Sequence, residues 1–195
     1  MSILDKALAA VIPLESDKDR TEATRRARAV AASGDWLSLA LDHHDMIRAA
    51  FDACRRARDP IDRAETLQRL KRVLIGHAQA EEVVLYPALE RAGERGDAGR
   101  AYGEQVAAKV HLAEIDRMEP TSDNWREKVD HLRNAVLHHI YEEENDWFLK
   151  LKEEAEDDPV WLTERFREEF ERYAGVTRPG GEFRSYAGSA GASPP

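Results

Sequence analysis

The chain reads HHIYEEE at residues 138–144 and HAQAEE at residues 77–82. Each stretch places an imidazole four residues before a carboxylate, as in His139-x-x-x-Glu143, and residues with that spacing lie on one face of an α-helix. An aromatic residue follows nine positions after the histidine in both cases. Two such pairs on two long helices are typical of a dinuclear metal site inside a helix bundle.

The composition narrows the class of protein. With 195 residues the chain is long enough for one domain with a substantial core, and 34% charged residues favour helices with salt-bridged surfaces. The formal charge of −9 argues against a nucleic-acid partner, because phosphate contacts need clustered lysine and arginine. The single cysteine, Cys54, excludes an internal disulfide and fits a reducing compartment. There is no apolar run of about 18 residues and no signal-peptide pattern, so we expect a cytoplasmic protein with no membrane partner.

Helix start and stop signals divide the chain into segments. Asp35 and Asp59 stand where N-caps are expected, and Pro60 suits a first helical position. Gly34 and Gly93 are stop signals. The expected helices of the bundle span residues 36–57, 60–92, 97–119 and 121–156.

Both ends of the chain carry additions to this bundle, which itself covers residues 35–156. We expect a helical appendage at residues 1–34, a C-terminal helix at 157–174, and a flexible Gly-, Ser- and Pro-rich tail at 175–195. Short connections make neighbouring helices antiparallel. The predicted fold is an all-α, up-down four-helix bundle with additional N- and C-terminal helices.

Helical periodicity indicates which candidate ligands face the core. On the second helix, His77 and Glu81 fall within about 60° of the centre of the leucine stripe. On the fourth helix, His139 and Glu143 point inward with the apolar residues, whereas His138 falls on the opposite side. Burying an imidazole and a carboxylate among leucines is costly unless both are satisfied. A bound cation satisfies both.

The first and third helices each offer a histidine. His44 lies to one side of the apolar face of its helix, much as His77 and His139 do on theirs, so we favour it as a ligand. Its neighbour His43 lies nearer the centre of that face and stays an alternative. His111 is the only histidine of the third helix, and it stands between two apolar residues.

Four histidines and two carboxylates form a mixed nitrogen and oxygen site. Imidazole suits iron, copper, zinc and nickel, and carboxylates bridge hard metal ions. Six protein ligands exceed what one tetrahedral zinc uses, whereas two ions bridged by Glu81 and Glu143 use them all. Any one of the histidines alone is better explained as a surface or hydrogen-bonded residue, and nearby aromatics such as Tyr86 as packing residues. The conjunction of two inward pairs with an inward histidine on each remaining helix favours metal.

These motifs resemble the hemerythrin-like, His-His-Glu cation-binding family. The resemblance covers roughly residues 35–151 and rests on LDHH at 41–44, HAQAEEVVLYPAL at 77–89, VHL at 110–112 and HHIYEEENDWF at 138–148. It implies a four-helix bundle around two non-haem iron ions joined by an oxo or hydroxo bridge. The iron ligands that it implies are His44, His77, Glu81, His111, His139 and Glu143, with the two glutamates as bridges.

The chain departs from the oxygen-carrying hemerythrins of invertebrates in two places. Those proteins bear two histidines one turn apart on the third helix, and this chain has Ile115 at the second of these positions. They also carry a His-x4-Asp pair on the last helix, where this chain has His139-x3-Glu143 followed by Glu144. A missing ligand leaves an open or water-filled coordination position. This favours redox reactivity toward peroxide or nitric oxide over simple oxygen carriage.

The motifs and the resemblance together predict a binding protein that takes up O₂ or a related small ligand, such as peroxide or nitric oxide, for storage, sensing or stress response. The first alternative is a di-iron oxidase, peroxidase or ferroxidase, although enzymes of that kind are richer in glutamate and use Glu-x-x-His pairs. The second alternative is a metal-free helical module that binds a protein partner through its acidic surface.

Overall fold

The computed structural model describes residues 15–175, and every regular element within them is a helix, which confirms the all-α prediction. The parts of the expected appendage and tail at residues 1–14 and 176–195 lie outside the described range. No described helix combines the length and apolar character needed to cross a membrane. The elements are α2 (Asp17–Val30), α3 (Trp36–Arg56), α4 (Pro60–Ala80), η1 (Glu81–Leu85), α5 (Tyr86–Arg91), α6 (Arg95–Asp116), α7 (Trp125–Glu142), η2 (Glu143–Trp147), α8 (Phe148–Glu154) and α9 (Pro159–Ala174).

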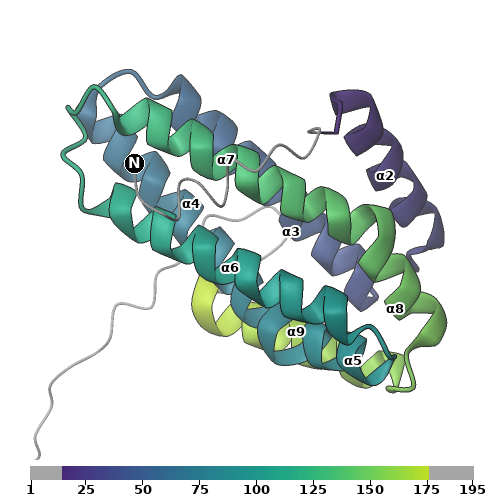
Figure 1. Cartoon of the computed structure of the whole chain (residues 1–195). Helices are drawn as coiled ribbons and strands as arrows, with labels where there is room; N and C mark the ends of the chain where they lie inside the picture. The colour runs from purple at the N-terminus through teal and green to yellow at the C-terminus, as the bar shows by residue number, and fades with distance from the viewer. Residues whose placement is uncertain (1–14, 176–195) are drawn as a thin grey trace, which may run out of the picture.

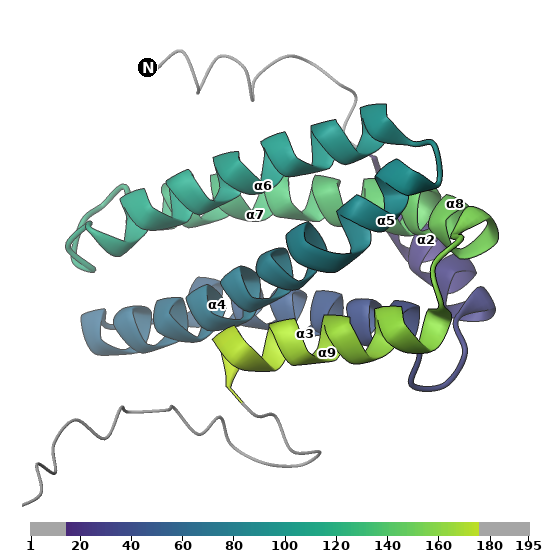
Figure 2. The same ribbon diagram turned by 90° about the horizontal axis from the view of Figure 1, so that it is seen from below.

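Four helices, α3, α4, α6 and α7, enclose the core of the bundle (Figure 1). α3 packs against α4 and α7, and α6 packs against the same two helices, so the four form a closed ring. This arrangement confirms the predicted helical bundle. α2 lies against η2 and α3, and α9 lies along α4 and α3 on another side (Figure 2).

Local signals begin two of the bundle helices where they were expected. Asp35 caps α3 by accepting a 2.8 Å hydrogen bond from the Ser38 amide. Asp59 caps α4 by accepting a 2.9 Å bond from the Asp62 amide, and Pro60 occupies the first position of that helix. The carboxylates satisfy N–H groups that have no partner within the helix, and each therefore fixes where its helix starts.

Two of the expected helices are interrupted by a wider, π-helical turn. The second runs as α4, η1 and α5, and the fourth runs as α7, η2 and α8. The amide of Tyr86 donates to the carbonyl of Glu81, and the amide of Phe148 donates to the carbonyl of Glu143, five residues back in both cases. Pro87 follows η1 closely and disfavours a regular α-helical turn before it, because proline lacks an N–H and its ring clashes with the preceding turn. Such turns are frequent at functional sites, and both begin at the glutamate of a His-x3-Glu pair.

Within residues 15–175, the buried apolar side chains form two clusters rather than one. Along α3, Leu41 belongs to the first cluster and Ile47 to the second, with the buried His44 between them. On the path from α4 into η1, the change falls between Leu74 and Val84. A layer of buried polar groups therefore separates two apolar halves of the bundle. This polar layer includes His44, His77, Glu81 and Glu143.

Candidate metal centre

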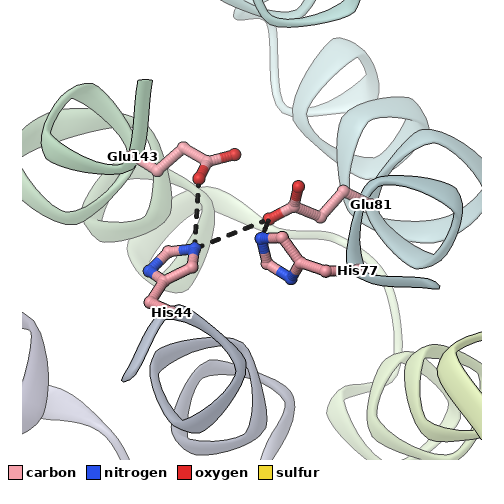
Figure 3. Close-up of side chains that lie close together, drawn as sticks. All are labelled: His44, His77, Glu81 and Glu143. Atoms are coloured by element: carbon pink, nitrogen blue, oxygen red, sulfur yellow. Dashed lines mark ion pairs between the residues drawn. The ribbon is translucent and has the colours of Figure 1, made fainter. Parts of the chain in front are cut away.

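Four buried side chains from four elements converge in the polar layer (Figure 3). His44 comes from α3, His77 from α4, Glu81 begins η1 and Glu143 begins η2, and one ligand atom from each lies within 4.8 Å of the others. Nε2 of His44 lies 3.2 Å from Oε2 of Glu143 and 3.9 Å from Oε1 of Glu81. Nε2 of His77 lies 3.0 Å from the same oxygen of Glu81.

The converging atoms fit a metal ion because no hydrogen bond satisfies them. The buried atoms without a hydrogen-bond partner include Nε2 of His44, Nε2 of His77, Oε1 of Glu81 and Oε2 of Glu143. An unpaired buried polar atom is costly, and one cation satisfies all four together. Ligand atoms about 2.1 Å from an ion lie about 3.0–3.4 Å apart at neighbouring positions, close to the shorter separations found here. Two imidazoles and two carboxylates suit iron or zinc.

The remaining oxygen of each glutamate faces a second group of polar side chains. The hydroxyl oxygen of Tyr86 lies 3.1 Å from Oε2 of Glu81 and 2.9 Å from Oε1 of Glu143. Gln105 of α6 donates a 2.8 Å hydrogen bond to Oε2 of Glu81. Nε2 of His139 lies 3.2 Å from Oε1 of Glu143. Each carboxylate therefore presents one oxygen to each side, as a bridge between two positions does.

His139 is held through both of its ring nitrogens. Nδ1 lies 2.7 Å from Oε2 of Glu104 on α6, on the opposite side of the ring from Glu143. Burial by itself lowers the pKa of His139, but the charge of Glu143 and hydrogen bonds to Glu104 and Glu143 outweigh it and raise the pKa to about 10. The metal-free ring is therefore protonated, and a metal that binds at Nε2 must displace a proton.

His44 is held in a similar way by Glu144, the residue that follows Glu143 in the sequence. Nδ1 of His44 lies 2.8 Å from Oε1 of Glu144, which is fully buried. Burial lowers the pKa of His44, yet the carboxylates of Glu143, Glu144 and Glu81 raise it well above its usual value. Sequence periodicity did not reveal Glu144, because consecutive residues of a regular helix do not normally share one face. In η2 both Glu143 and Glu144 are buried.

Three histidines named from the sequence lie outside the four converging side chains: His139, which contacts the other oxygen of Glu143, together with His43 and His111. His43 stacks on Phe170 and Phe166 of α9, with ring centroids 3.6 and 5.3 Å apart. Burial, and then the charges of neighbouring histidines, lower the pKa of His43 well below its usual value. Of the two candidates on the first helix, it is His44 that points into the centre. His111 is buried on α6, and it is likewise not one of the four converging ligands.

The α6 side chains that do reach the glutamate and histidine groups are Gln105 and Glu104. A sequence signal for Gln105 exists: it shares a helical face with Ala101, Ala108 and Leu112, and all four are buried. A polar residue within an apolar stripe is the same sign that pointed to the ligands on the second helix. Tyr86, which was expected only to pack, is fully buried with its hydroxyl against both glutamates.

The two π-turns place related aromatic residues beside the histidines. Phe148, directly after η2, stacks on His44 with ring centroids 5.9 Å apart. Tyr86, directly after η1, has its hydroxyl oxygen 3.0 Å from Nε2 of His139. The aromatic residue that follows each His-x3-Glu pair therefore contacts a histidine of another helix, and the repeat in the sequence has a counterpart in space.

Comparison with known proteins agrees with this geometry. A curated protein named "DNA nickase", from Nostoc sp., is 28% identical over 123 residues, which make up 62% of this chain but 35% of that relative, so the chain spans about a third of its length. No solved structure matches the chain. A family model described as the hemerythrin HHE cation-binding domain matches residues 37–151, more than half of the chain and the part that holds the four converging histidines and glutamates. The chain belongs to the hemerythrin HHE cation-binding domain family.

Proposed function

We propose that the chain is a non-haem di-iron protein that binds O₂ or a related small ligand, such as peroxide or nitric oxide, for storage, sensing or stress response. The observation that carries the proposal is the orientation of Glu81 and Glu143. Each of these buried carboxylates turns one oxygen toward His44 and the other toward the side of His139 and Tyr86. Two positions that share the same pair of carboxylates favour two ions over one.

The two proposed positions differ in how ready they are for an ion. The first is held by His44, His77 and one oxygen from each glutamate, and these atoms have no other hydrogen-bond partner. The second is held by the other glutamate oxygens and by His139. His111 completes it in the proposal, following the family pattern, and Gln105 then gives up its hydrogen bond to the carboxylate. Loading of the second position is therefore expected to be the weaker of the two.

Iron bound by these residues would supply electrons and a coordination position for the small ligand. The apolar clusters on both sides of the polar layer limit the access of water. Burial, and then the charges of Glu143 and Glu81, raise the pKa of Tyr86 well above its usual value, so its hydroxyl keeps its proton. Tyr86 thus holds a hydrogen-bond donor at the inner edge of the centre. A hydrogen-bond donor held among buried side chains suits the binding of a small ligand that needs protection from water.

A di-iron oxidase, peroxidase or ferroxidase is the second candidate. The observation that favours it is the pair of hydrogen-bond donors at the centre, Tyr86 and Gln105, which could stabilise negative charge that develops on a peroxide oxygen. In addition, Ile115 is buried in an apolar cluster and supplies no ligand, as expected from the sequence. Repeated turnover of peroxide in the presence of a reductant would assign the protein to this class.

DNA cleavage is not part of the proposal. The relative named a nickase is much longer than this chain, which covers 35% of it. The formal charge of −9 opposes the approach of a phosphate backbone. The proposal accordingly includes neither a nucleic-acid partner nor a membrane partner.

The test is iron quantification together with optical spectra of the reduced and oxidised protein, for wild type, His139→Ala and His138→Ala. We expect two irons per chain in wild type and reversible charge-transfer bands when the reduced protein is aerated. His139→Ala should hold at most one iron, while His138→Ala, whose partly exposed ring pairs with Glu15 and not with the converging side chains, should match wild type. A wild-type chain that binds no iron, or that binds it with no oxygenated species, contradicts the proposal.

A further inference from the structure

Glu144 connects the metal centre to α2, a helix that precedes the residues matched by the family model. Its Oε1 accepts hydrogen bonds from Nδ1 of His44 and from the guanidinium of Arg48, both at 2.8 Å. Its Oε2 accepts a hydrogen bond from the hydroxyl of Thr24 on α2. Because Glu144 is fully buried, these protein groups take the place of water around its carboxylate.

The contact with Glu144 determines which nitrogen of His44 faces the centre. An ionised carboxylate only accepts hydrogen bonds, so Nδ1 of His44 carries the hydrogen in this pair. Nε2 is then the nitrogen that can bind a metal once its proton is displaced, and it faces Glu143 and Glu81, whose oxygens lie 3.2 and 3.9 Å away. Loss of such a partner in metal sites weakens metal binding by roughly 10- to 100-fold. Whatever positions Glu144 therefore acts on the metal affinity of His44.

α2 docks on the bundle with little apolar area. Its buried residues are Ala23 and Ala27, and alanine contributes only a small hydrophobic surface. Polar contacts hold the helix in place: Arg28 pairs with Asp42 of α3 at 2.7 Å, and Arg26 donates to Asn145 of η2. Figure 1 shows α2 on the outside of the bundle beside α8. A helix docked in this way depends on each polar contact that it makes, the bond from Thr24 to Glu144 included.

We propose that α2 is a working part of the metal centre: Thr24 positions Glu144, Glu144 positions His44, and docking of α2 is thereby coupled to metal binding. This inference rests on the proposed metal centre and adds to it a positioning residue from outside the family domain. Such coupling is reciprocal. A metal that fixes His44 strengthens the docking of α2, and loss of the Thr24 hydroxyl speeds the release of metal.

The test uses the full chain loaded with cobalt(II), whose visible absorption reports the geometry of its ligands. Wild type is compared with Thr24→Val, which keeps the shape but removes the hydroxyl, and with Thr24→Ser, which keeps the hydroxyl. Thr21→Val is the matched control, because Thr21 is exposed on the same helix and its hydroxyl donates to the carbonyl of Asp17 at 2.8 Å. Release of cobalt to excess chelator is followed by absorption, and amide hydrogen exchange of α2 is measured with and without cobalt.

We expect Thr24→Val to release cobalt about 3- to 10-fold faster than wild type, with a shifted visible spectrum, which is a smaller effect than loss of a direct ligand partner. Thr24→Ser and Thr21→Val should behave as wild type. Cobalt should slow the exchange of α2 amides in wild type and not in Thr24→Val. Unchanged release from Thr24→Val, or equal acceleration in Thr21→Val, overturns this coupling but leaves the metal centre standing. A wild-type chain that takes up no cobalt overturns both.

Discussion

The hydroxyl oxygen of Tyr86 lies 2.9 Å from Oε1 of Glu143. It also lies 3.1 Å from Oε2 of Glu81 and 3.0 Å from Nε2 of His139, and it accepts a 3.0 Å hydrogen bond from Gln105. A phenol has one proton to donate, so it cannot satisfy both carboxylates at once. Tyr86 therefore lies between the two glutamates and leaves one of them without its proton. It does so on the His139 side, where the second proposed ion position lies.

Replacing Tyr86 with phenylalanine removes this hydroxyl and keeps the ring. A buried carboxylate then loses its donor, and we expect the metal-free chain to lose about 1–3 kcal/mol of unfolding free energy. The metal-loaded chain should lose less, because an ion at the glutamates takes over from the missing donor. Urea unfolding with and without metal measures both quantities.

Tyr102→Phe is the control for this substitution. The hydroxyl of Tyr102 donates to the carbonyl of Glu82 at 3.0 Å, at a partly buried position. Its removal should cost about 0.5–1.5 kcal/mol, and the same amount with and without metal. If Tyr86→Phe showed the same lack of dependence on metal, its hydroxyl would have no special link to the ion site.

The adjacent histidines of α3 should respond differently to truncation. His44→Ala removes one of the converging ligands, so metal content should fall sharply. His43→Ala removes a ring stacked on Phe170 and Phe166, so it should lower the unfolding free energy by about 2 kcal/mol and leave the metal content unchanged. Metal analysis and urea unfolding of the two variants separate these effects. Loss of metal from His43→Ala alone would reverse the assignment.

Much of the fold was predictable because its signals are local. The caps at Asp35 and Asp59 act within their own helices, and the inward direction of His77 follows from a period that one helix displays by itself. The π-turns were not predictable in this way, because a shift of backbone hydrogen bonds leaves the order of residue types unchanged. Glu144 was missed for that reason: its burial depends on the geometry of η2.

The role of α6 was harder to predict because contacts between helices decide it. The sequence offers one histidine there, His111, and the family pattern selects it. The structure instead places Gln105 against Glu81, and Glu104 against His139. The axial position of α6 relative to its neighbours determines which of its turns lies at the centre. The sequence of α6 alone does not determine that position.

The unfolding free energy of the metal-free chain should depend on pH because of His139. Its pKa is raised to about 10 from an ordinary value of 6.5, so the folded state binds this proton more tightly than the unfolded state. The stabilisation is fully present below pH 6.5 and is lost as the pH rises toward 10. Metal affinity should change in the opposite direction over this window, because the ion must displace the proton.

Urea unfolding of the metal-free chain and metal titrations, each at several pH values in this window, measure the two trends. His139→Gln cannot take up a proton, so both trends should become flatter in that variant. In wild type, the unfolding free energy should fall and the metal affinity should rise as the pH increases. A metal affinity that falls as the pH rises would contradict the role given to His139.

Gly76 permits the close contact of α4 with α9. A Cβ atom at this position would lie 2.9 Å from Cβ and 3.2 Å from the backbone nitrogen of Ala174. We therefore expect Gly76→Ala to lower the unfolding free energy by about 1–3 kcal/mol through overpacking. Gly103→Ala in α6 is the matched control, because nothing lies within 4 Å of its added Cβ and alanine favours a helix by about 0.5–1 kcal/mol. Thermal unfolding of the two variants should show shifts of opposite sign.

The aromatic residues that follow the two π-turns make the two sides of the centre chemically different. Phe148 and Tyr86 occupy equivalent places after η2 and η1, but Phe148 stacks the face of its ring on His44, whereas Tyr86 brings an oxygen atom to His139. A diatomic molecule held between them would meet unlike surroundings at its two ends. The repeated backbone thus presents unlike side chains on the two sides of the centre, and under the proposed function the ligand atom nearer the Tyr86 hydroxyl would be the one that receives a hydrogen bond.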